Sequence, residues 1–411
     1  MSTQNDPQEQ GSSTSALQAR FAPLFERIAA GAVARETERR LAFDEVRALQ
    51  QAGFGALRLP VALGGASISV RQQFELLIAL GAADSNLVQA FRSHLIFVED
   101  QRLQALQGDA RARRWLARVA EGKFFGNGTT ERGEGAAQRY QTTVRQTPQG
   151  WRLDGEKFYS TGSLYADYIA VAADRDGQRV TVLVPADAPG LTQRDDWDGF
   201  GQRLTASGHS AYVDVAVHED DIAEGGYGSP GRTWATAYLQ LVLLAALAGI
   251  TRRVEQDAIA WVRERTRTFS HAPAALPKDD PLVQETIGKL SAAAFGTRAA
   301  VLAVAEALDL TLDAGGTDPE AIDRVERAAA QAQDVVIGLA LEASTRFFEV
   351  GGSSLAGRAH AHDRHWRNAR TLATHNPLAY KLRALGANLL NGDPLPYQWS
   401  AGVRPANGAG A

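Results

Sequence analysis

The stretch WRNARTLATHNPLAYK, residues 366–381, decides how the whole chain is interpreted. It lies late in a long helical region and interrupts it, because Pro377 cannot continue a helix and disfavours helical backbone at Asn376. Basic residues precede the interruption, and His375 stands just before it. A histidine at such a break is well placed to face a cavity, and the alternative is a capping histidine on a solvated turn.

Length and composition are those of an ordinary globular protein with a sizeable core. The chain has 411 residues, of which 45% are hydrophobic and 22% charged, and its net charge of -4 offers no basic face for nucleic acid. Because cysteine is absent, disulfides, thiolate zinc sites and thiol nucleophiles are excluded. The most apolar run, LQLVLLAALAGI, is too short for a membrane span, and we expect no signal peptide. We therefore expect a cytoplasmic protein.

The hydrophobic period changes twice along the chain and suggests five segments. We expect a disordered tail, a helical domain, a β-barrel domain, a helical bundle and a flexible end, over residues 1–16, 17–122, 123–228, 229–400 and 401–411. Within the bundle, long helices are predicted over 234–268, 281–313, 318–349 and 378–390. Four helices of this length favour an antiparallel four-helix bundle.

The domain order and the break resemble the acyl-CoA dehydrogenase superfamily over roughly residues 17–400. In its dehydrogenase branch this late segment carries a catalytic glutamate followed by glycine, and that pair aligns with Asn376-Pro377. An amide has no basic site at working pH and cannot abstract a substrate α-proton. The pattern R-N-x-R-T-x-x-x-H-x-P is similar instead to the flavin-dependent monooxygenase branch, typified by the dibenzothiophene monooxygenases. The resemblance implies a mainly α fold: an N-terminal helical domain, a central β-barrel and a C-terminal four-helix bundle.

Two segments of the β region are candidates for contact with a flavin ring. GNGTTE (residues 126–131) offers backbone N–H groups and small hydroxyls to a polar ring edge, although most such stretches are plain turns. KFYSTG (residues 157–162) places an aromatic and a hydroxyl residue two apart, on one side of a strand, and an ordinary alternating strand is the alternative. The resemblance implies that the flavin-facing residues are Asn127, Thr130, Tyr159 and Thr161.

His94 and Trp197 are candidates for the substrate pocket, together with Tyr159. His94 lies on an apolar helix face, where a buried structural histidine is the alternative. Trp197 belongs to a loop similar to the family's G-x-R-x-T-x-S segment and is either core or a stacking wall of the pocket. The resemblance implies that His94 is a catalytic or pocket-wall residue near the cofactor.

RTRTF (residues 265–269) and EVGGSSL (residues 349–355) are the candidates for a phosphate site. The resemblance implies that an arginine and a Gly-Gly loop meet the phosphate end of the cofactor, often from a neighbouring subunit. A guanidinium suits phosphate because its fork is bidentate and always charged. The spacing leaves Arg265 or Arg267, each of which could instead be a solvated helix end. Our preferred set is Arg267, Gly351, Gly352, Ser353 and Ser354.

Other cofactor motifs are missing from the sequence. Neither a P-loop nor a strand-then-helix GxGxxG is present, which weakens nucleotide-binding interpretations. The histidines of AHAHDRH, residues 359–365, lack carboxylate partners at ligand spacing, so we expect a surface segment and no metal.

The resemblance implies a two-component monooxygenase. Reduced flavin, FMN in preference to FAD, would arrive from an NAD(P)H-dependent reductase and react with O2 to form a flavin hydroperoxide. His375 would donate a proton, Asn127 and Thr161 would orient flavin and oxygen, and a sulfur, nitrogen or aromatic carbon of a small substrate would be oxygenated. A homotetramer is expected. The alternatives are an acyl-CoA dehydrogenase or oxidase whose base has moved, with Glu342 and Glu349 nearest, and a non-catalytic helical binding protein.

Overall fold

The structure is a computed structural model that describes residues 13–132, 139–225 and 231–397. The expected flexible end and most of the expected tail lie outside the described residues. Helix α1 begins at Thr14, where the Ser13 hydroxyl accepts the N–H of Ala16, so the tail boundary drawn at residue 16 is too late.

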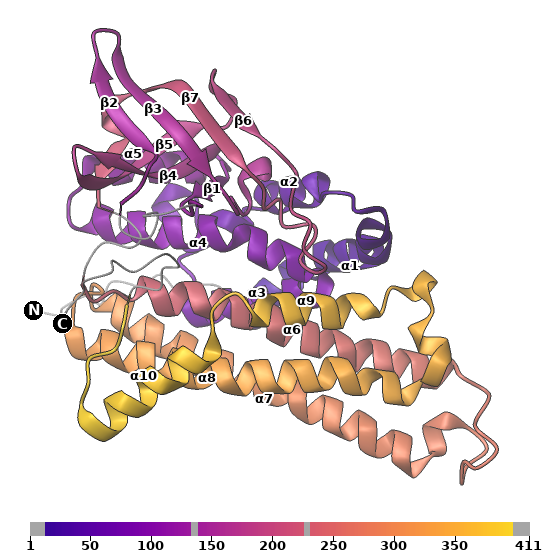
Figure 1. The fold of residues 1–411 in the computed structure, drawn as a ribbon. Coiled ribbons are helices and arrows are strands. Elements are labelled where there is room, and N and C mark those ends of the chain that lie inside the picture. Colours follow the sequence, from indigo (N-terminus) through magenta and orange to yellow (C-terminus); the bar gives the residue numbers. More distant parts are fainter. Residues whose placement is uncertain (1–12, 133–138, 226–230, 398–411) are drawn as a thin grey trace, which may run out of the picture.

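The N-terminal part is helical, as predicted. Its helices are α1 (Thr14–Glu38), α2 (Phe43–Gln51), α3 (Val70–Ala83), α4 (Ser85–Leu106) and α5 (Ala110–Ala120). Helix α3 packs on the C-terminal helices, and α4 contacts both these helices and strand β1. Most side chains of α4 are therefore buried, and α4 lies between the sheet and the bundle (Figure 1).

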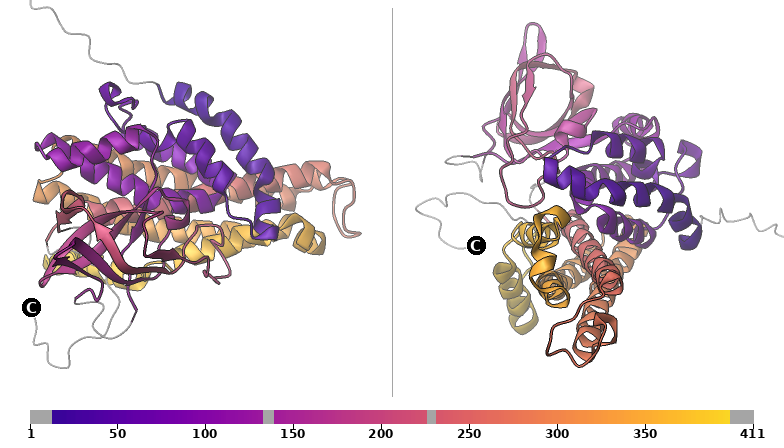
Figure 2. Two further views of the ribbon diagram at one scale, coloured as in Figure 1. Left: turned by 90° about the horizontal axis from the view of Figure 1, so that it is seen from above. Right: turned by 90° about the vertical axis from the view of Figure 1, so that its right-hand side faces the viewer.

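The central part is one eight-stranded mixed sheet with the order β6-β7-β3-β2-β4-β5-β8, and β1 pairs in parallel with β4. The strands are β1 (Phe125–Gly128), β2 (Thr143–Thr147), β3 (Gly150–Lys157), β4 (Tyr168–Arg175), β5 (Gln178–Pro185), β6 (Leu191–Gln193), β7 (Ser210–Val217) and β8 (Ile222–Glu224). The sheet is curled (Figure 2, right), and β6 and β8 are the ends of its hydrogen-bonded path. A curled mixed sheet thus forms the central β domain at the place where the sequence predicted a small β-barrel.

The C-terminal part is a helical bundle, as predicted. Its helices are α6 (Ala235–Glu264), α7 (Pro281–Asp313), α8 (Pro319–Arg346), α9 (Asp363–Ala373) and α10 (Leu378–Asn391). The predicted break is present, because α9 ends at Ala373 and α10 begins directly after Pro377. The stretch before the break forms a helix of its own, α9, which packs on α6 and α8.

One continuous core of buried apolar residues joins the N-terminal helices to the bundle, and a separate core lies within the sheet. In a third buried cluster, which includes Trp115 and Phe125, α4 and α5 pack against the strands. Because the helical parts share their core, α4 and α9 are held in a fixed relation to each other, which positions the site between them.

Two helices, α6 and α7, are long and apolar enough to cross a membrane by length and composition. The expectation that no apolar segment reaches this length is therefore wrong. The most apolar window of α6 is 83% buried inside the protein, as in the core helix of a soluble protein, whereas that of α7 is only 33% buried.

Candidate functional site

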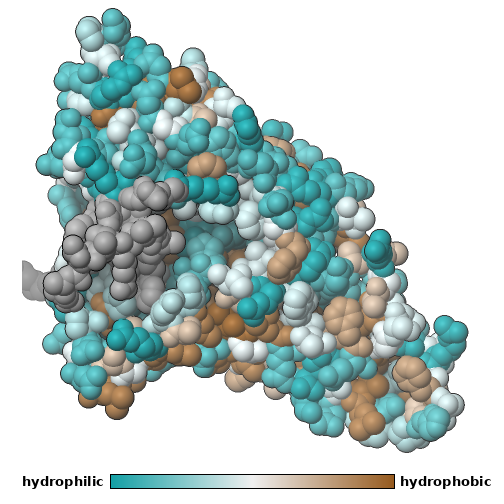
Figure 3. All heavy atoms as spheres, viewed as in Figure 1, coloured by the Kyte–Doolittle hydropathy of each residue, from teal (hydrophilic) through white to brown (hydrophobic). Residues whose placement is uncertain are grey.

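The face of the molecule between the sheet and the bundle is hollowed, with a hydrophilic interior (Figure 3). Two of the predicted segments meet α4. Gly162, after β3, lies against the helix, because a Cβ at this position would stand 2.5 Å from the Ala90 carbonyl oxygen. The guanidinium of Arg92 lies 3.5 Å from Nε2 of His375. Segments more than two hundred residues apart are thereby brought to the same helix.

Asn127 lies on β1 beside the turn that follows β3. Its backbone oxygen accepts the Ser163 hydroxyl at 2.8 Å, and its Nδ2 donates to Thr129 Oγ1 at 3.4 Å. Asn127 Oδ1 and Ser160 Oγ are buried and find no hydrogen-bond partner among the described residues. Leaving a buried polar atom unsatisfied costs roughly 1–3 kcal/mol, and a polar ligand seated here would remove that cost.

The segment around Tyr159 and Thr161 departs from the predicted strand. Strand β3 ends at Lys157 and Tyr159 has a left-handed φ of 57°, so the strand alternation proposed for this pair is wrong. Tyr159 is 46% exposed, and Thr161 bonds Ser207 Oγ at 2.7 Å. Thr130 is exposed, and its carbonyl accepts the N–H of Phe158 at 2.8 Å.

Trp197 is partly buried in the loop that follows β6. Its ring meets the Tyr159 ring edge-on at 6.0 Å, and its indole N–H donates to the Gly201 carbonyl at 3.2 Å. Arg39 donates to the Trp197 carbonyl and pairs with Asp195. Trp197 is therefore beside the flavin candidate Tyr159 and outside the main apolar core, which favours the pocket-wall alternative.

His375 is solvent-accessible, yet protein atoms surround it and displace most of the bulk water. This desolvation and the neighbouring Arg92 guanidinium lower the pKa of His375 to about 3, so the ring is neutral near pH 7. A guanidinium only donates, so Nε2 is the acceptor in the contact with Arg92 and the ring proton resides on Nδ1. Asn376 Nδ2 donates to Gln240 Oε1 at 2.6 Å, and this hydrogen bond attaches the break between α9 and α10 to α6.

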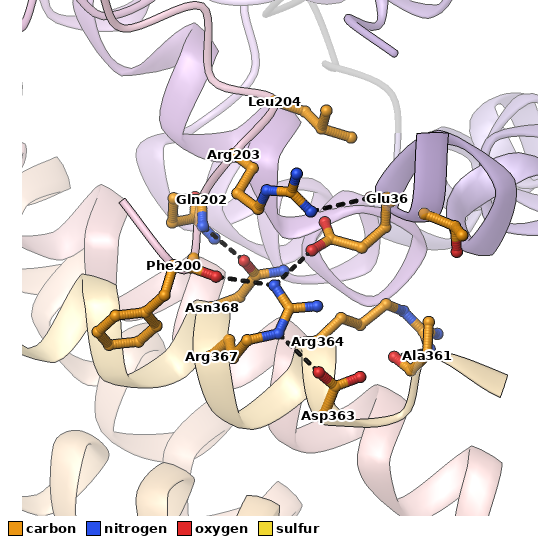
Figure 4. A network of polar contacts seen from close by, with 12 residues as sticks. Glu36, Phe200, Gln202, Arg203, Leu204, Ala361, Asp363, Arg364, Arg367 and Asn368 are labelled. Carbon is orange, nitrogen blue, oxygen red and sulfur yellow. Dashed lines mark hydrogen bonds and ion pairs between the residues drawn. The ribbon is translucent and has the colours of Figure 1, made fainter. Parts of the chain in front are cut away.

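The motif residues Arg367 and Asn368 attach α9 to the loop before β7 (Figure 4). Arg367 Nη1 donates to Glu36 Oε1 at 2.7 Å and to the Phe200 carbonyl at 2.8 Å. Asn368 Oδ1 accepts the Gln202 N–H at 2.6 Å. The WRNAR motif therefore ties α1, α9 and the loop together.

His94 is 1% exposed, and both ring nitrogens bind backbone groups. Nε2 lies 3.0 Å from the Gly55 carbonyl oxygen and donates to it, and Nδ1 accepts the Phe125 N–H at 3.2 Å. The ring also stacks on Phe124. This geometry supports the structural alternative, with His94 fastening α4 to β1, and leaves neither nitrogen for a ligand.

We expect His94 to make the protein acid-sensitive. Burial lowers the pKa of His94 to about 4, so between pH 6.5 and pH 4 the unfolded chain binds a proton that the folded chain does not. Stability is therefore lost as pH falls, by up to ~2 kcal/mol from pH 6.5 to 5. Urea denaturation of wild type and His94→Gln at pH 7 and pH 5 measures this. Equal losses for both proteins would contradict it.

The phosphate candidates are only partly brought together. Arg265 Nη1 donates to the Gly351 carbonyl at 2.7 Å, while Arg267, the preferred candidate, is exposed. Gly352 has a left-handed φ of 57° and lies against the Phe269 ring. Ser353 and Ser354 are exposed beside this loop. Arg265, and not Arg267, is therefore the arginine that reaches the loop.

The expectation of a surface AHAHDRH segment is wrong for His365, which is 4% exposed. His365 Nε2 donates to Asp257 Oδ2 on α6 at 2.8 Å, a carboxylate partner that the sequence did not indicate. Asp257, His362 and His365 place their potential ligand atoms within 4.8 Å of one another, close enough to share a metal ion. However, Arg253 and Arg364 also pair with Asp257, so its charge is already compensated.

Sequence reasoning missed Arg92, Gln202, Thr205 and Ser207. Arg92 carried a signal, since a cation among apolar residues of a buried helix needs a partner. The two hydroxyl residues lay within a recognised motif, T-x-S, but nothing local indicated that they would reach Thr161.

The acyl-CoA dehydrogenase middle-domain family matches residues 126–215, and the acyl-CoA dehydrogenase C-terminal-domain family matches residues 241–380. A dibenzothiophene monooxygenase from Rhodococcus erythropolis is 25% identical over 397 residues, covering 91% of this chain and 93% of the relative. A probable FMNH2-dependent monooxygenase, SfnC from Pseudomonas putida, is 25% identical over 357 residues, covering 84% and 87%. The crystal structure of TdsC from Paenibacillus sp. A11-2 with FMN and indole has a TM-score of 0.84 and 26% identity, covering 94% and 99%.

Proposed function

Because this chain belongs to the acyl-CoA dehydrogenase superfamily, we propose that it is a flavin-dependent monooxygenase of that superfamily, the oxygenase of a two-component system. The observation that carries the proposal is the residue pair at the α9–α10 break. Asn376, an amide bound to Gln240, aligns with the glutamate of the dehydrogenase branch, and the neutral imidazole of His375 directly precedes it. A hydrogen-bond donor is present at this place, and the carboxylate base for α-proton abstraction is missing.

The alternative of a relocated base loses its support. Glu342 and Glu349 are both exposed and pair with Arg346 on the surface, at 2.6 and 3.4 Å. A non-catalytic binding protein is disfavoured because the similarity to monooxygenases spans nearly the whole chain and the candidate catalytic histidine is present.

FMN is the cofactor that the relatives support, since TdsC is solved with FMN and SfnC is described as FMNH2-dependent. The fit to this chain rests on the unsatisfied Asn127 Oδ1 and Ser160 Oγ, which would bind a polar ring edge. Asn127, Ser160 and Thr161 would hold the ring, and Arg265 with the Gly351–Gly352 loop would hold the phosphate. When bound, reduced flavin supplies the two electrons that activate O2.

The residues of the chain have separate tasks in this reaction. One oxygen atom of O2 goes to the substrate and the other leaves as water, which requires delivery of a proton. His375, with its hydrogen on Nδ1 and Arg92 at Nε2, is placed to donate a hydrogen bond to the reacting oxygen and so to orient it for that proton, which comes from solvent. Tyr159 and Trp197 would exclude water from the pocket and pack on the substrate. Dibenzothiophene and indole, named for the relatives, support a small heteroatom-containing substrate.

Oxygen consumption tests the proposal. The protein is mixed with FMN, NADH and an unrelated flavin reductase, and a panel of aromatic sulfides, indoles and amines is added. We expect oxygenated product to form with at least one class, and no acyl-CoA to bleach bound flavin anaerobically, because Asn376 is not a base. Acyl-CoA-dependent bleaching, or reduced FMN that fails to bind, would overturn the proposal.

We further propose a homotetramer assembled through α7. Exposed apolar side chains on this helix include Leu282 (67%), Phe295 (74%) and Leu310 (73%), which a contact between subunits would cover. We expect Phe295→Glu to reduce the mass measured by light scattering, because a charge would be buried at the contact. Leu106→Glu, at a 73% exposed position at the end of α4, is the matched control and should leave the mass unchanged. A wild-type monomer would refute the assembly.

A further inference from the structure

Three hydroxyl groups form a chain that ends at the flavin candidate Thr161. Thr161 Oγ1 lies 2.7 Å from Ser207 Oγ, and Ser207 Oγ lies 2.8 Å from Thr205 Oγ1. Thr205 Oγ1 donates to the Gln202 carbonyl at 3.0 Å. Thr205 and Ser207 are buried, at 2% and 8% exposure, whereas Thr161 is only partly buried. The outer end of the chain therefore faces the site.

In one arrangement, the direction of these hydrogen bonds is set by the carbonyl at the inner end. A carbonyl oxygen only accepts, so the Thr205 hydroxyl donates to Gln202 and accepts from Ser207, and Ser207 in turn accepts from Thr161. Each hydroxyl has one hydrogen, so the hydrogen of Thr161 is used inside the protein and its lone pairs face outward.

The opposite direction leads to the same result at Thr161. If Thr205 donates to Ser207 and Ser207 to Thr161, the Thr161 hydrogen goes to the Tyr159 carbonyl, 3.3 Å away. Both arrangements keep three hydrogen bonds within the protein. Donation from Thr161 to a ligand would leave only two, so the chain makes Thr161 an acceptor toward the site.

The inner end of the chain is held rigidly by α9. The Gln202 N–H donates to Asn368 Oδ1 at 2.6 Å, and both residues are buried (Figure 4). Gly201 lies directly on α9, since a Cβ there would stand 2.2 Å from the Arg367 carbonyl oxygen. Gln202 and Ala206 also have left-handed φ values of 51° and 52°, so the loop has one defined course.

We propose that this hydroxyl chain makes the site select reduced flavin over oxidised flavin. This inference rests on the proposed function, in which the turn carrying Thr161 meets the reactive edge of the flavin ring. The ring nitrogen N5 carries a hydrogen in reduced flavin and is a bare acceptor in oxidised flavin. The Thr161 oxygen, as an acceptor facing the site, accepts a hydrogen bond from N5–H of the reduced ring. In the oxidised ring N5 has a lone pair instead, which repels the lone pairs of the Thr161 oxygen.

Binding of the two redox forms tests the selection without turnover. Dissociation constants for oxidised and anaerobically reduced FMN are measured for wild type, Ser207→Ala and Thr205→Val. Both variants interrupt the chain and leave the Thr161 hydrogen with a weaker internal acceptor, the Tyr159 carbonyl at 3.3 Å. We therefore expect the preference for reduced FMN to fall, by up to about tenfold, the scale of one hydrogen bond. For a two-electron couple this is a fall of about 30 mV in the potential of bound flavin. Thr192→Val, an exposed hydroxyl on β6, is the control.

The outcomes separate the two proposals. Wild-type protein that binds neither redox form would refute the proposed function and this inference with it. Flavin binding with the same redox preference in wild type, Ser207→Ala and Thr205→Val would refute the inference alone. A lower preference in both chain variants, with the Thr192→Val control at the wild-type value, would establish it.

Discussion

The His375→Ala variant is expected to fold, to bind reduced FMN, and to oxygenate substrate at least on the order of 10²-fold more slowly than wild type. Folding survives because the break between α9 and α10 is set by Pro377 and held by the bond from Asn376 to Gln240. The rate falls because the variant lacks the Nδ1–H group with which the neutral imidazole donates a hydrogen bond to the reacting oxygen. Oxygen that is activated without transfer should be released as hydrogen peroxide.

Product formation and peroxide release, measured per NADH consumed, check this result. His360→Ala is the matched control, because His360 is exposed and precedes α9 on the same segment. We expect this control to keep wild-type coupling. If His375→Ala oxygenates substrate at nearly the wild-type rate with unchanged peroxide release, His375 only caps the turn.

Replacement of Arg367 by methionine should destabilise the protein by about 3–5 kcal/mol. Arg367 lies between the Glu36 carboxylate, the Phe200 carbonyl and Asp363 (Figure 4). Glu36 is 2% exposed, and without Arg367 its carboxylate keeps no hydrogen-bond partner among the described residues. The loss therefore reflects an uncompensated buried charge as well as a lost contact.

Chemical denaturation of two further variants separates these causes. Arg370→Met makes the same change on an exposed face of α9 and should cost less than about 0.5 kcal/mol. Adding Glu36→Leu to Arg367→Met removes the buried charge and should recover most of the lost stability. Equal losses for Arg367→Met and Arg370→Met would show that the pair with Glu36 contributes nothing.

Much of the fold follows from the sequence because the deciding interactions are local. Helix α7 covers residues 281–313 as predicted, with Asp280 as its cap and Pro281 in its first turn. The break at Pro377 follows from the ring of a single residue. The β domain shows the limit, since alternation predicts strands but not whether their sheet closes.

The structure brings the main candidate residues from the sequence near one another. The turn with Thr161 and the break with His375 both reach α4, at Ala90 and Arg92, and Asn127 lies on β1 beside that turn. Their residue types and the loss of the glutamate at Asn376 already predicted oxygenation in place of dehydrogenation. These predictions needed the chemistry of each residue together with the resemblance of its motif to the family.

Only the tertiary structure decided what each polar side chain binds. It engages both nitrogens of His94 with backbone, joins His365 to Asp257, and makes Arg265 the arginine that reaches the Gly351 loop. It also brings Ser207 to Thr161, which determines that this hydroxyl accepts. Backbone preferences depend on neighbours within a few residues, whereas a hydrogen bond depends on distances between segments that only packing brings together.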